Sequence, residues 1–180
     1  MTTDAFKRSL KDHQDKGFFK NLKILRGIER ESLRVSEKGR ISQKNHPESL
    51  GSPLTSKDIT TDFAEALVEL VTPTFESAEE LFKHLNLLHR FLYSEMEGEM
   101  LWNFSMPCAF ENEQEIRIAE YGETNSGMLK HIYRKGLRLR YGSIMQCVSG
   151  IHYNFSLSKE SWHSLSDDPD QDFICLLYTS

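Results

Sequence analysis

Hydrophobic and polar residues alternate in the stretch "GIERESLRV", Gly27 to Val35, and this alternation predicts a β-strand. Because successive side chains of an extended chain point to opposite faces, Glu29 and Glu31 should share one face with Leu33 and Val35. An isolated Glu-x-Glu pair is most often solvated, and that is the simplest interpretation of this one. The alternative is that both carboxylates face inward, which requires a cation or another partner between them.

The same alternation recurs in "SGIHYNFSL", Ser149 to Leu157, and predicts a second strand. One of its faces is apolar and is expected to pack on helices. The other face is polar and carries His152, Asn154 and Ser156. A third stretch, "FAEALVELVT" (Phe63 to Thr72), is ambiguous, because its Ala and Glu residues favour a helix. We assign it as a strand, since β-branched residues precede the proline that closes it.

Apolar residues at helical spacing predict three helices. A charged amphipathic helix is expected around Asp4 to Asp15. A second helix begins after Ser77, which forms a capping-box pattern with Glu80, and a third runs from about Ser126 to Tyr141, with Gly142 as its stop. The residues expected to face inward are Leu81, Leu85, Leu88 and Leu92 in the second helix, and Leu129, Ile132, Tyr133 and Leu137 in the third. Residues 39–53 and most of 100–123 are expected to be loops.

The composition is typical of a folded globular protein, with 180 residues, of which 38% are hydrophobic and 27% are charged. A formal net charge of −5 gives no reason to expect a nucleic acid as a partner. The three cysteines, Cys108, Cys147 and Cys175, are odd in number and widely spaced, so a reducing cytoplasm is the expected location. The charged N-terminal residues do not have the pattern of a signal peptide.

Residues 141–158 contain no Lys, Arg, Asp or Glu, and this length is close to that of a membrane-spanning helix. However, the segment includes several Ser residues together with Gln146, His152 and Asn154, whose polar groups are unfavourable in hydrocarbon. We therefore expect no membrane association.

Acidic side chains and one imidazole are candidates for a metal site. Glu29, Glu31 and Glu69, with Asp62 shortly before the last, and His152 lie in or near the candidate strands. Several carboxylates with at most one imidazole suit a hard cation, Mg²⁺ or Mn²⁺, whereas zinc favours paired His or Cys. The alternative is that Glu65 and Glu69 lie on a helix surface and that His152 is a hydrogen-bonded core residue. These residues alone leave both interpretations open.

Five distinctive strings follow one another along the chain: "RGIERESLRV", "HPESLGSPLTSKDITTDFAEALVELVTP", "LWNFSMPC", "AEYGETNSGMLKHIYRKGLRLRYG" and "MQCVSGIHYNFSL". Together they resemble the N-terminal part of proteobacterial glutamate–cysteine ligase, also called γ-glutamylcysteine synthetase. The resemblance covers roughly Phe19 to Leu157, and the family's chains are much longer. Residues 1–172 are therefore expected to be the N-terminal part of a single catalytic domain. We expect residues 173–180 to be a non-native tail, since "CLLYTS" ends the chain abruptly.

The resemblance implies an α+β fold similar to glutamine synthetase, in which a curved, mainly antiparallel sheet forms a funnel with helices packed outside. In this chain the funnel would be incomplete. The resemblance also implies that ATP phosphorylates the γ-carboxyl of glutamate and that the amine of cysteine then displaces phosphate. This reaction is the first step of glutathione synthesis. ATP would be the co-substrate, and Mg²⁺, with Mn²⁺ as an alternative, would offset the phosphate charge.

The resemblance further implies roles for individual residues. Those that fall on or near the family's Mg²⁺ positions are Glu29, Glu31, Asp62, Glu69 and His152, of which Glu29 and Glu69 are expected to be catalytic. Gln146 and Asn154 match positions that hold glutamate, and Tyr133 and Arg134 match positions on the cysteine side. Without the resemblance, Tyr133 is equally a core residue, Arg134 a solvated base, and both amides partners of the backbone.

Family segments that supply further nucleotide, metal and glutamate contacts are absent, so the chain alone is expected to be inactive. Two other functions stay open at this point. One is a carboxylate–amine ligase of the same superfamily that uses a different amine. The other is a non-catalytic fragment that binds a metal or a partner.

Overall fold

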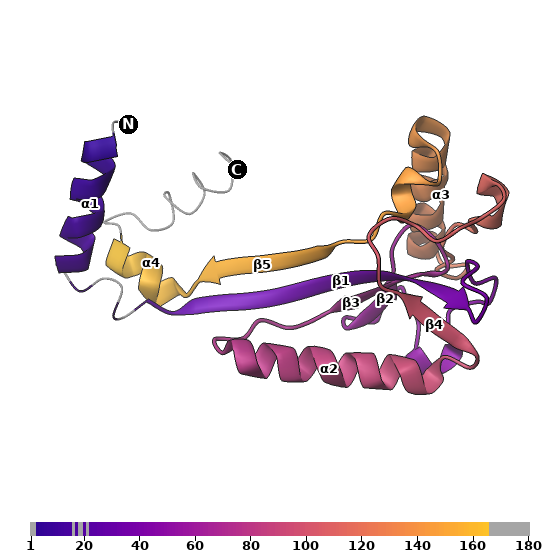
Figure 1. Ribbon diagram of the computed structural model, residues 1–180, viewed down its shortest axis with the longest axis horizontal. Helices are drawn as coiled ribbons and strands as arrows, with labels where there is room; N and C mark the ends of the chain where they lie inside the picture. Colours follow the sequence, from indigo (N-terminus) through magenta and orange to yellow (C-terminus); the bar gives the residue numbers. More distant parts are fainter. Residues whose placement is uncertain (1–2, 16, 18–19, 21, 166–180) are drawn as a thin grey trace. The chain divides into compact units, whose positions relative to one another are not determined.

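The structure is a computed structural model that describes residues 3–15, 17, 20 and 22–165 (Figure 1). Two compact units are distinguished within the chain: Gly27–Asn154, and the terminal segments Met1–Arg26 with Phe155–Ser180. The helices and strands, in chain order, are α1 (Thr3–Asp15), β1 (Ile24–Ser36), η2 (Glu48–Leu50), β2 (Ile59–Thr61), β3 (Leu67–Val71), α2 (Ala78–Glu95), β4 (Glu99–Trp102), η3 (Glu113–Glu115), α3 (Asn125–Tyr141), η4 (Met145–Cys147), β5 (Ile151–Leu157) and α4 (Lys159–Leu165).

An antiparallel sheet organises the larger unit. The strand order is β2-β3-β1-β4, and β5 also pairs with β1. Strand β1 pairs with β3 over Glu29–Leu33 and with β4 over Leu33–Ser36. Figure 1 shows β5 beside β1, running in the opposite direction. The predicted α+β class with a mainly antiparallel sheet is confirmed.

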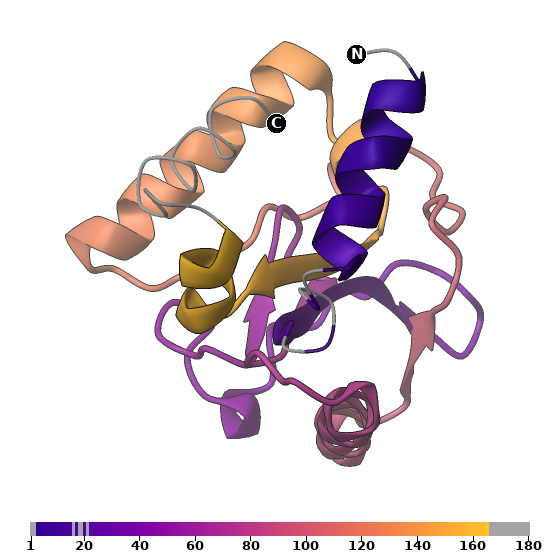
Figure 2. The ribbon, with the colours of Figure 1, turned by 90° about the vertical axis from the view of Figure 1, so that its left-hand side faces the viewer.

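Two apolar clusters lie on the two faces of this sheet, because neighbouring residues of each strand point to opposite sides. Leu33, Val35 and Leu67 contribute to one cluster, against which Leu137 of α3 packs. The other contains Leu70 of β3 and Leu92 of α2, and Leu85 and Leu88 of α2 pack against it. Helices α2 and α3 therefore cover opposite faces, as Figure 2 shows.

Helix α2 forms as its sequence predicts. The Ser77 hydroxyl accepts a hydrogen bond from the Glu80 amide at its N-terminus. Leu81 and Leu92 are almost completely buried, and the other two leucines of the stripe are partly buried. Full burial of one leucine side chain stabilises the fold by about 1.5–3 kcal/mol. Leu92→Ala would therefore destabilise the unit by about 2–5 kcal/mol.

Helix α3 begins and ends as expected but presents a different face to the core. Gly142 ends the helix with a φ of 77°. Leu129, Ile132 and Tyr133, expected to face inward, are 57–69% exposed, so this prediction is wrong. Arg134 and Arg138 point inward instead and donate hydrogen bonds to the backbone carbonyls of Asp62 and Ile116.

The strands also depart from the pattern-based expectations. In the stretch 63–72 only Leu67–Val71 is a strand, because residues 63–66 turn the chain from β2 into β3. Strands β2 and β4 were not expected, since three or four residues show no measurable alternation. The apolar face of β5 was expected to pack on helices, but Ile151 and Tyr153 are 69% and 56% exposed.

In the terminal unit, α1 matches the expected amphipathic helix. The Lys23 amide donates to the Ser161 hydroxyl, and the Lys23 carbonyl accepts from the Ser158 amide. These bonds connect the residue just before β1 to α4. Within the described residues, no helix combines the length and apolar character needed to cross a membrane. The tail expected at residues 173–180 lies outside the described residues.

Candidate functional site

Two carboxylates face each other on adjacent strands of the sheet. Glu31 of β1 and Glu69 of β3 are directly paired in the antiparallel register, and Glu29 lies two residues from Glu31 on the same face. This face is the one opposite α2, and all three glutamates are only partly exposed. The inward interpretation of the Glu-x-Glu pair therefore describes this protein better than a freely solvated face.

The Glu31 carboxylate is held by the segment that leads into β5. The Gly150 amide donates to Glu31 Oε2 at 2.8 Å, and the Glu31 amide donates to the Gly150 carbonyl at 3.0 Å. Burial raises the pKa of Glu31, and the hydrogen bond from Gly150 partly opposes this effect. The paired backbone bonds fix Glu31 relative to the start of β5.

The polar face of β5 lies against Glu29. His152 Nδ1 is 3.3 Å from Glu29 Oε2, and the Asn154 side-chain amide donates to Glu29 Oε1 at 2.9 Å. The His152 side chain is 58% exposed, so the alternative of a core histidine is wrong. The alternation of "IHYNF" thus brings two of the expected site residues to one carboxylate.

Glu69 experiences the strongest effect of this arrangement. Burial, followed by the negative charges of Asp62, Glu31 and Glu29, raises the pKa of Glu69 to about 7, and His152 acts in the opposite direction. Glu69 lies on a strand, so the alternative of a helix surface is wrong. We call Glu29, Glu31, Asp62 and Glu69 the carboxylate cluster, because the four acids are close enough to interact electrostatically.

Arg134 connects α3 to the carboxylate cluster. Its Nε donates to the Asp62 carbonyl at 2.5 Å, and its guanidinium lies 3.7 Å from Asp62 Oδ1. Its side chain is only 13% exposed, so the alternative of a solvated base is wrong. Tyr133, the next residue, is 60% exposed, so it is not a core residue either. Gln146 lies in η4, and no hydrogen bond joins its side chain to the cluster within the described residues.

Comparison with known proteins identifies the family of this chain. A model of the family described as glutamate-cysteine ligase matches residues 8–178. This chain belongs to the glutamate–cysteine ligase family. A protein named glutamate–cysteine ligase from Pseudomonas entomophila is 54% identical over 143 residues, which are 79% of this chain and 27% of the relative. A Pseudomonas putida protein of the same name is 50% identical over 159 residues, which are 86% of this chain and 30% of the relative.

Solved structures agree with the family assignment. The crystal structure of a glutamate–cysteine ligase from Francisella tularensis, described as a complex with AMP, superposes with a TM-score of 0.78 at 44% identity. It covers 81% of this chain, which corresponds to 29% of the neighbour. A bifunctional glutathione synthetase from Pasteurella multocida gives a TM-score of 0.72 at 33% identity, over 85% of this chain and 19% of the neighbour. The chain thus spans less than a third of its relatives' length.

For this member of the family, the cluster does not form a closed coordination sphere by itself. Within the part of the chain that the structure describes, no three His, Cys, Asp or Glu residues are placed so that they could hold a metal ion. The donors are nevertheless carboxylate oxygens with one imidazole, which is the chemistry of a hard divalent cation. Burial, and after it the neighbouring carboxylates, raise the pKa of Glu69, and a cation would offset the negative charge of those neighbours.

Two residues near the cluster were not expected from the sequence. Glu65, considered only as a surface residue, is buried and accepts hydrogen bonds from the His46 and Glu120 amides. Tyr121 is buried, and its hydroxyl donates to the Thr61 and Asp62 carbonyls. The sequence offers one signal for Tyr121, an aromatic residue followed by a glycine in "AEYGETNSG". This pattern does not reveal the backbone carbonyls that accept its hydrogen bonds.

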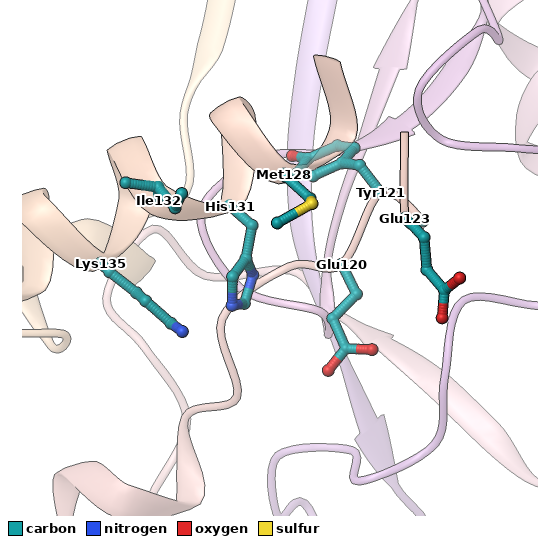
Figure 3. Close-up of a pocket in the computed structure, with 8 residues that line it drawn as sticks. Glu120, Tyr121, Glu123, Met128, His131, Ile132 and Lys135 are labelled. Carbon is teal, nitrogen blue, oxygen red and sulfur yellow. The ribbon is translucent and has the colours of Figure 1, made fainter. Parts of the chain in front are cut away.

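A pocket of about 380 Å³ lies between the segment before α3 and α3 itself (Figure 3). Glu120 and Glu123 contribute to it from the segment, and Met128, His131 and Lys135 contribute from the helix. None of the site residues expected from the sequence lines it. The carboxylate cluster, rather than this pocket, therefore remains the candidate site of the family's chemistry.

Proposed function

We propose that this chain is the N-terminal part of a catalytic domain that joins the γ-carboxyl of glutamate to the amine of cysteine, with consumption of ATP. The observation that supports this function best is the carboxylate cluster on one face of the sheet, in a chain of the glutamate–cysteine ligase family. Residues 1–172 would belong to this domain, and residues 173–180 would be a non-native tail. The product would enter glutathione synthesis.

The proposed reaction has two steps. An oxygen of the glutamate γ-carboxylate attacks the γ-phosphorus of ATP, ADP leaves, and γ-glutamyl phosphate forms. The amine nitrogen of cysteine then attacks the acyl carbon. The bond between that carbon and the phosphate oxygen breaks, phosphate leaves, and the nitrogen loses a proton. Positioning and electrostatic stabilisation provide most of the catalysis in transfers of this kind.

The carboxylate cluster with His152 would hold Mg²⁺, or Mn²⁺ in its place, and Glu29 and Glu69 would act as the catalytic pair. When bound, the cation would offset the negative charge of the ATP phosphates. The close approach of four acids supports this assignment, because such carboxylates need a partner of opposite charge. His152 would help to orient Glu29, which it contacts through Nδ1.

The substrate-binding assignments come from the family resemblance, and the surroundings of Asn154 and Arg134 support two of them. The Asn154 amide lies against Glu29, so Asn154 would place glutamate beside the cluster, with Gln146 as a second contact. Arg134 approaches Asp62 from α3, and its guanidinium is suited to recognise the α-carboxylate of the acceptor amino acid. Tyr133 would line the same acceptor side. Cys108 and Cys147 are free buried thiols, which supports a reducing compartment, the cytoplasm.

The test uses the full-length protein that contains this segment. Release of ADP and phosphate should require both glutamate and cysteine, and mass spectrometry should detect γ-glutamylcysteine. Glu29→Gln, purified in parallel, controls for contaminating enzymes. Robust turnover with ammonia but none with cysteine would replace this proposal with another carboxylate–amine ligase. Absence of turnover with every amine, in a folded protein with Mg²⁺ and ATP, would favour a non-catalytic binding function.

A further inference from the structure

Tyr121 touches two parts of the candidate site at once. Its hydroxyl lies 2.7 Å from the Thr61 carbonyl and 2.9 Å from the Asp62 carbonyl, so one proton is shared between the two acceptors. The Arg134 guanidinium carbon lies 4.7 Å from the centre of its ring. Asp62 belongs to the carboxylate cluster, and Arg134 is on the proposed acceptor side. Tyr121 therefore connects groups with different proposed roles.

The Asp62 carbonyl is the point where these contacts meet. It accepts the hydrogen bond from Arg134 Nε as well as the one from the Tyr121 hydroxyl. Because the guanidinium also lies 3.7 Å from Asp62 Oδ1, the orientation of Arg134 affects the field at this carboxylate. A guanidinium over an aromatic ring is stabilised by about 0.5–2 kcal/mol, depending on its exposure. The ring thus favours one orientation among the many that a free arginine could adopt.

Backbone contacts fix the position of Tyr121 relative to the start of α3. Thr124 caps the helix by accepting a hydrogen bond from the Gly127 amide. A Cβ atom at Gly127 would lie 2.5 Å from the Tyr121 carbonyl oxygen, so only glycine permits this close approach. Arg134 lies two helical turns after Gly127, and this spacing brings its side chain over the ring. Docking of α3 and placement of Arg134 are therefore coupled.

We propose that Tyr121 is a positioning residue that fixes Arg134 and Asp62 relative to each other, and so couples acceptor binding to divalent-cation binding. This inference rests on the proposed function for the identity of the two ligands. Tyr121 itself is buried, with its hydroxyl on the Asp62 carbonyl and its ring against the Arg134 guanidinium. Its hydroxyl determines the position of the Asp62 carbonyl, and its ring determines the position of the guanidinium.

The kinetic test uses Tyr121→Phe in the full-length protein, which removes the hydroxyl and keeps the ring. The KM for cysteine and the Mg²⁺ concentration for half-activation should each rise about fivefold or more, while the KM for glutamate changes less than twofold. A purely structural role would lower the active fraction and change none of these constants. Tyr93→Phe, on the exposed side of α2, is the matched control and should behave as wild type.

A double-mutant cycle tests whether the effect passes through Arg134. In an Arg134→Lys background, Tyr121→Phe should change the KM for cysteine by less than half as much as it does in the wild type. If the two substitutions change the KM for cysteine by independent factors, the proposed coupling is wrong. A Tyr121→Phe enzyme with wild-type constants would also overturn it.

A measurement on the 180-residue chain separates this inference from the proposed function. The Nε–H resonance of Arg134, assigned by its loss in Arg134→Lys, should exchange with solvent at least tenfold more slowly than that of a free arginine. Tyr121→Phe should accelerate this exchange, whether or not the full-length protein ligates cysteine. A resonance that exchanges as fast as free arginine in the wild type would overturn the inference, even if the enzyme is active.

Discussion

Glu31 and Glu69 face each other directly across the β1–β3 pair, with no intervening residue in the register. Like charges directly opposite on neighbouring strands destabilise a sheet. Here the repulsion is increased by partial burial and by Asp62 and Glu29, and the pKa of Glu69 rises to about 7. A sheet with this pair is less stable at neutral pH than a sheet without it. Such a loss of stability is typical of residues that form a binding site, and not of residues that serve only to pack the fold.

Glu69→Gln should stabilise the 180-residue chain at neutral and alkaline pH. The pKa of Glu69 is raised from an ordinary 4.5 to about 7, so the folded state binds the extra proton. This contribution to stability is complete below pH 4.5 and is lost as the pH rises to about 7. With allowance for solvent screening, the free energy of unfolding of the variant should exceed that of the wild type by about 1–2 kcal/mol at pH 8. Near pH 4 the two should be equally stable.

Urea unfolding from pH 4 to pH 8, with a chelator present, measures this difference. Some pH dependence should remain in the variant, because the pKa of Glu31 is also raised. Glu37→Gln, at an exposed turn position, is the control and should show no such trend. A Glu69→Gln variant that is no more stable than wild type at pH 8 would contradict the placement of Glu69 among the other acids.

Glu29→Gln should reduce the ligase activity of the full-length protein by at least about a hundredfold, because it removes an anionic ligand while keeping the side-chain size. The thermal unfolding midpoint should change little, since Glu29 is partly exposed and Gln can still accept from Asn154. Initial rates measured across a Mg²⁺ series test the assignment, with Glu37→Gln as control. Near-wild-type turnover at limiting Mg²⁺ would exclude Glu29 as a ligand.

The strands of the site could be predicted from the sequence because their signal is local. Alternation alone placed Glu29 and Glu31 on the face of Leu33 and Val35, and the structure agrees. The same rule predicted that His152 and Asn154 share a face, and both contact Glu29. The alternation of side chains between the two faces is a property of the extended backbone, so it does not depend on what the strand packs against.

The inner face of α3 could not be predicted in this way. Its apolar residues suggested a buried stripe, but Arg134 and Arg138 point inward toward carbonyls of residues far away in the chain. Backbone acceptors carry no sequence signature, since every residue has a carbonyl. Leu129 and Ile132, two of the exposed apolar residues of this helix, also lie in a chain that spans less than a third of its relatives' length. Hydrophobicity predicts burial when all of the surfaces that cover a helix are present, and this chain matches only 27–30% of its relatives' length.

Gly127→Ala and Gly136→Ala should have opposite effects, although both glycines lie within α3. At Gly136 a Cβ would meet only the Arg140 guanidinium at 3.7 Å, so alanine should stabilise the helix by about 0.5–1 kcal/mol. At Gly127 a Cβ would clash with the Tyr121 and Gly122 carbonyls at 2.5 and 2.7 Å. Alanine there should destabilise the chain by about 1–3 kcal/mol. Chemical unfolding of the two variants gives the sign, and stabilisation by Gly127→Ala would show that α3 does not dock on Tyr121.

The 180-residue chain by itself should show no measurable ligase activity and only marginal stability. The carboxylate cluster does not form a metal site alone within the described residues, and the chain matches only 27–30% of the relatives' length. Ile151 and Tyr153 of β5 and Leu129 of α3 are exposed, and such apolar surface favours association.

A ligand stabilises a protein only as far as its concentration exceeds its dissociation constant. Mg²⁺ with ATP and glutamate should therefore raise the unfolding midpoint of the isolated chain by less than about 2 °C, because an incomplete site binds weakly. Thermal unfolding with and without these ligands, together with phosphate release, measures both properties, and the full-length protein is the positive control. A midpoint raised by many degrees, or steady turnover, would show that these residues form a self-sufficient domain and that the missing two thirds of the relatives are not required for the chemistry.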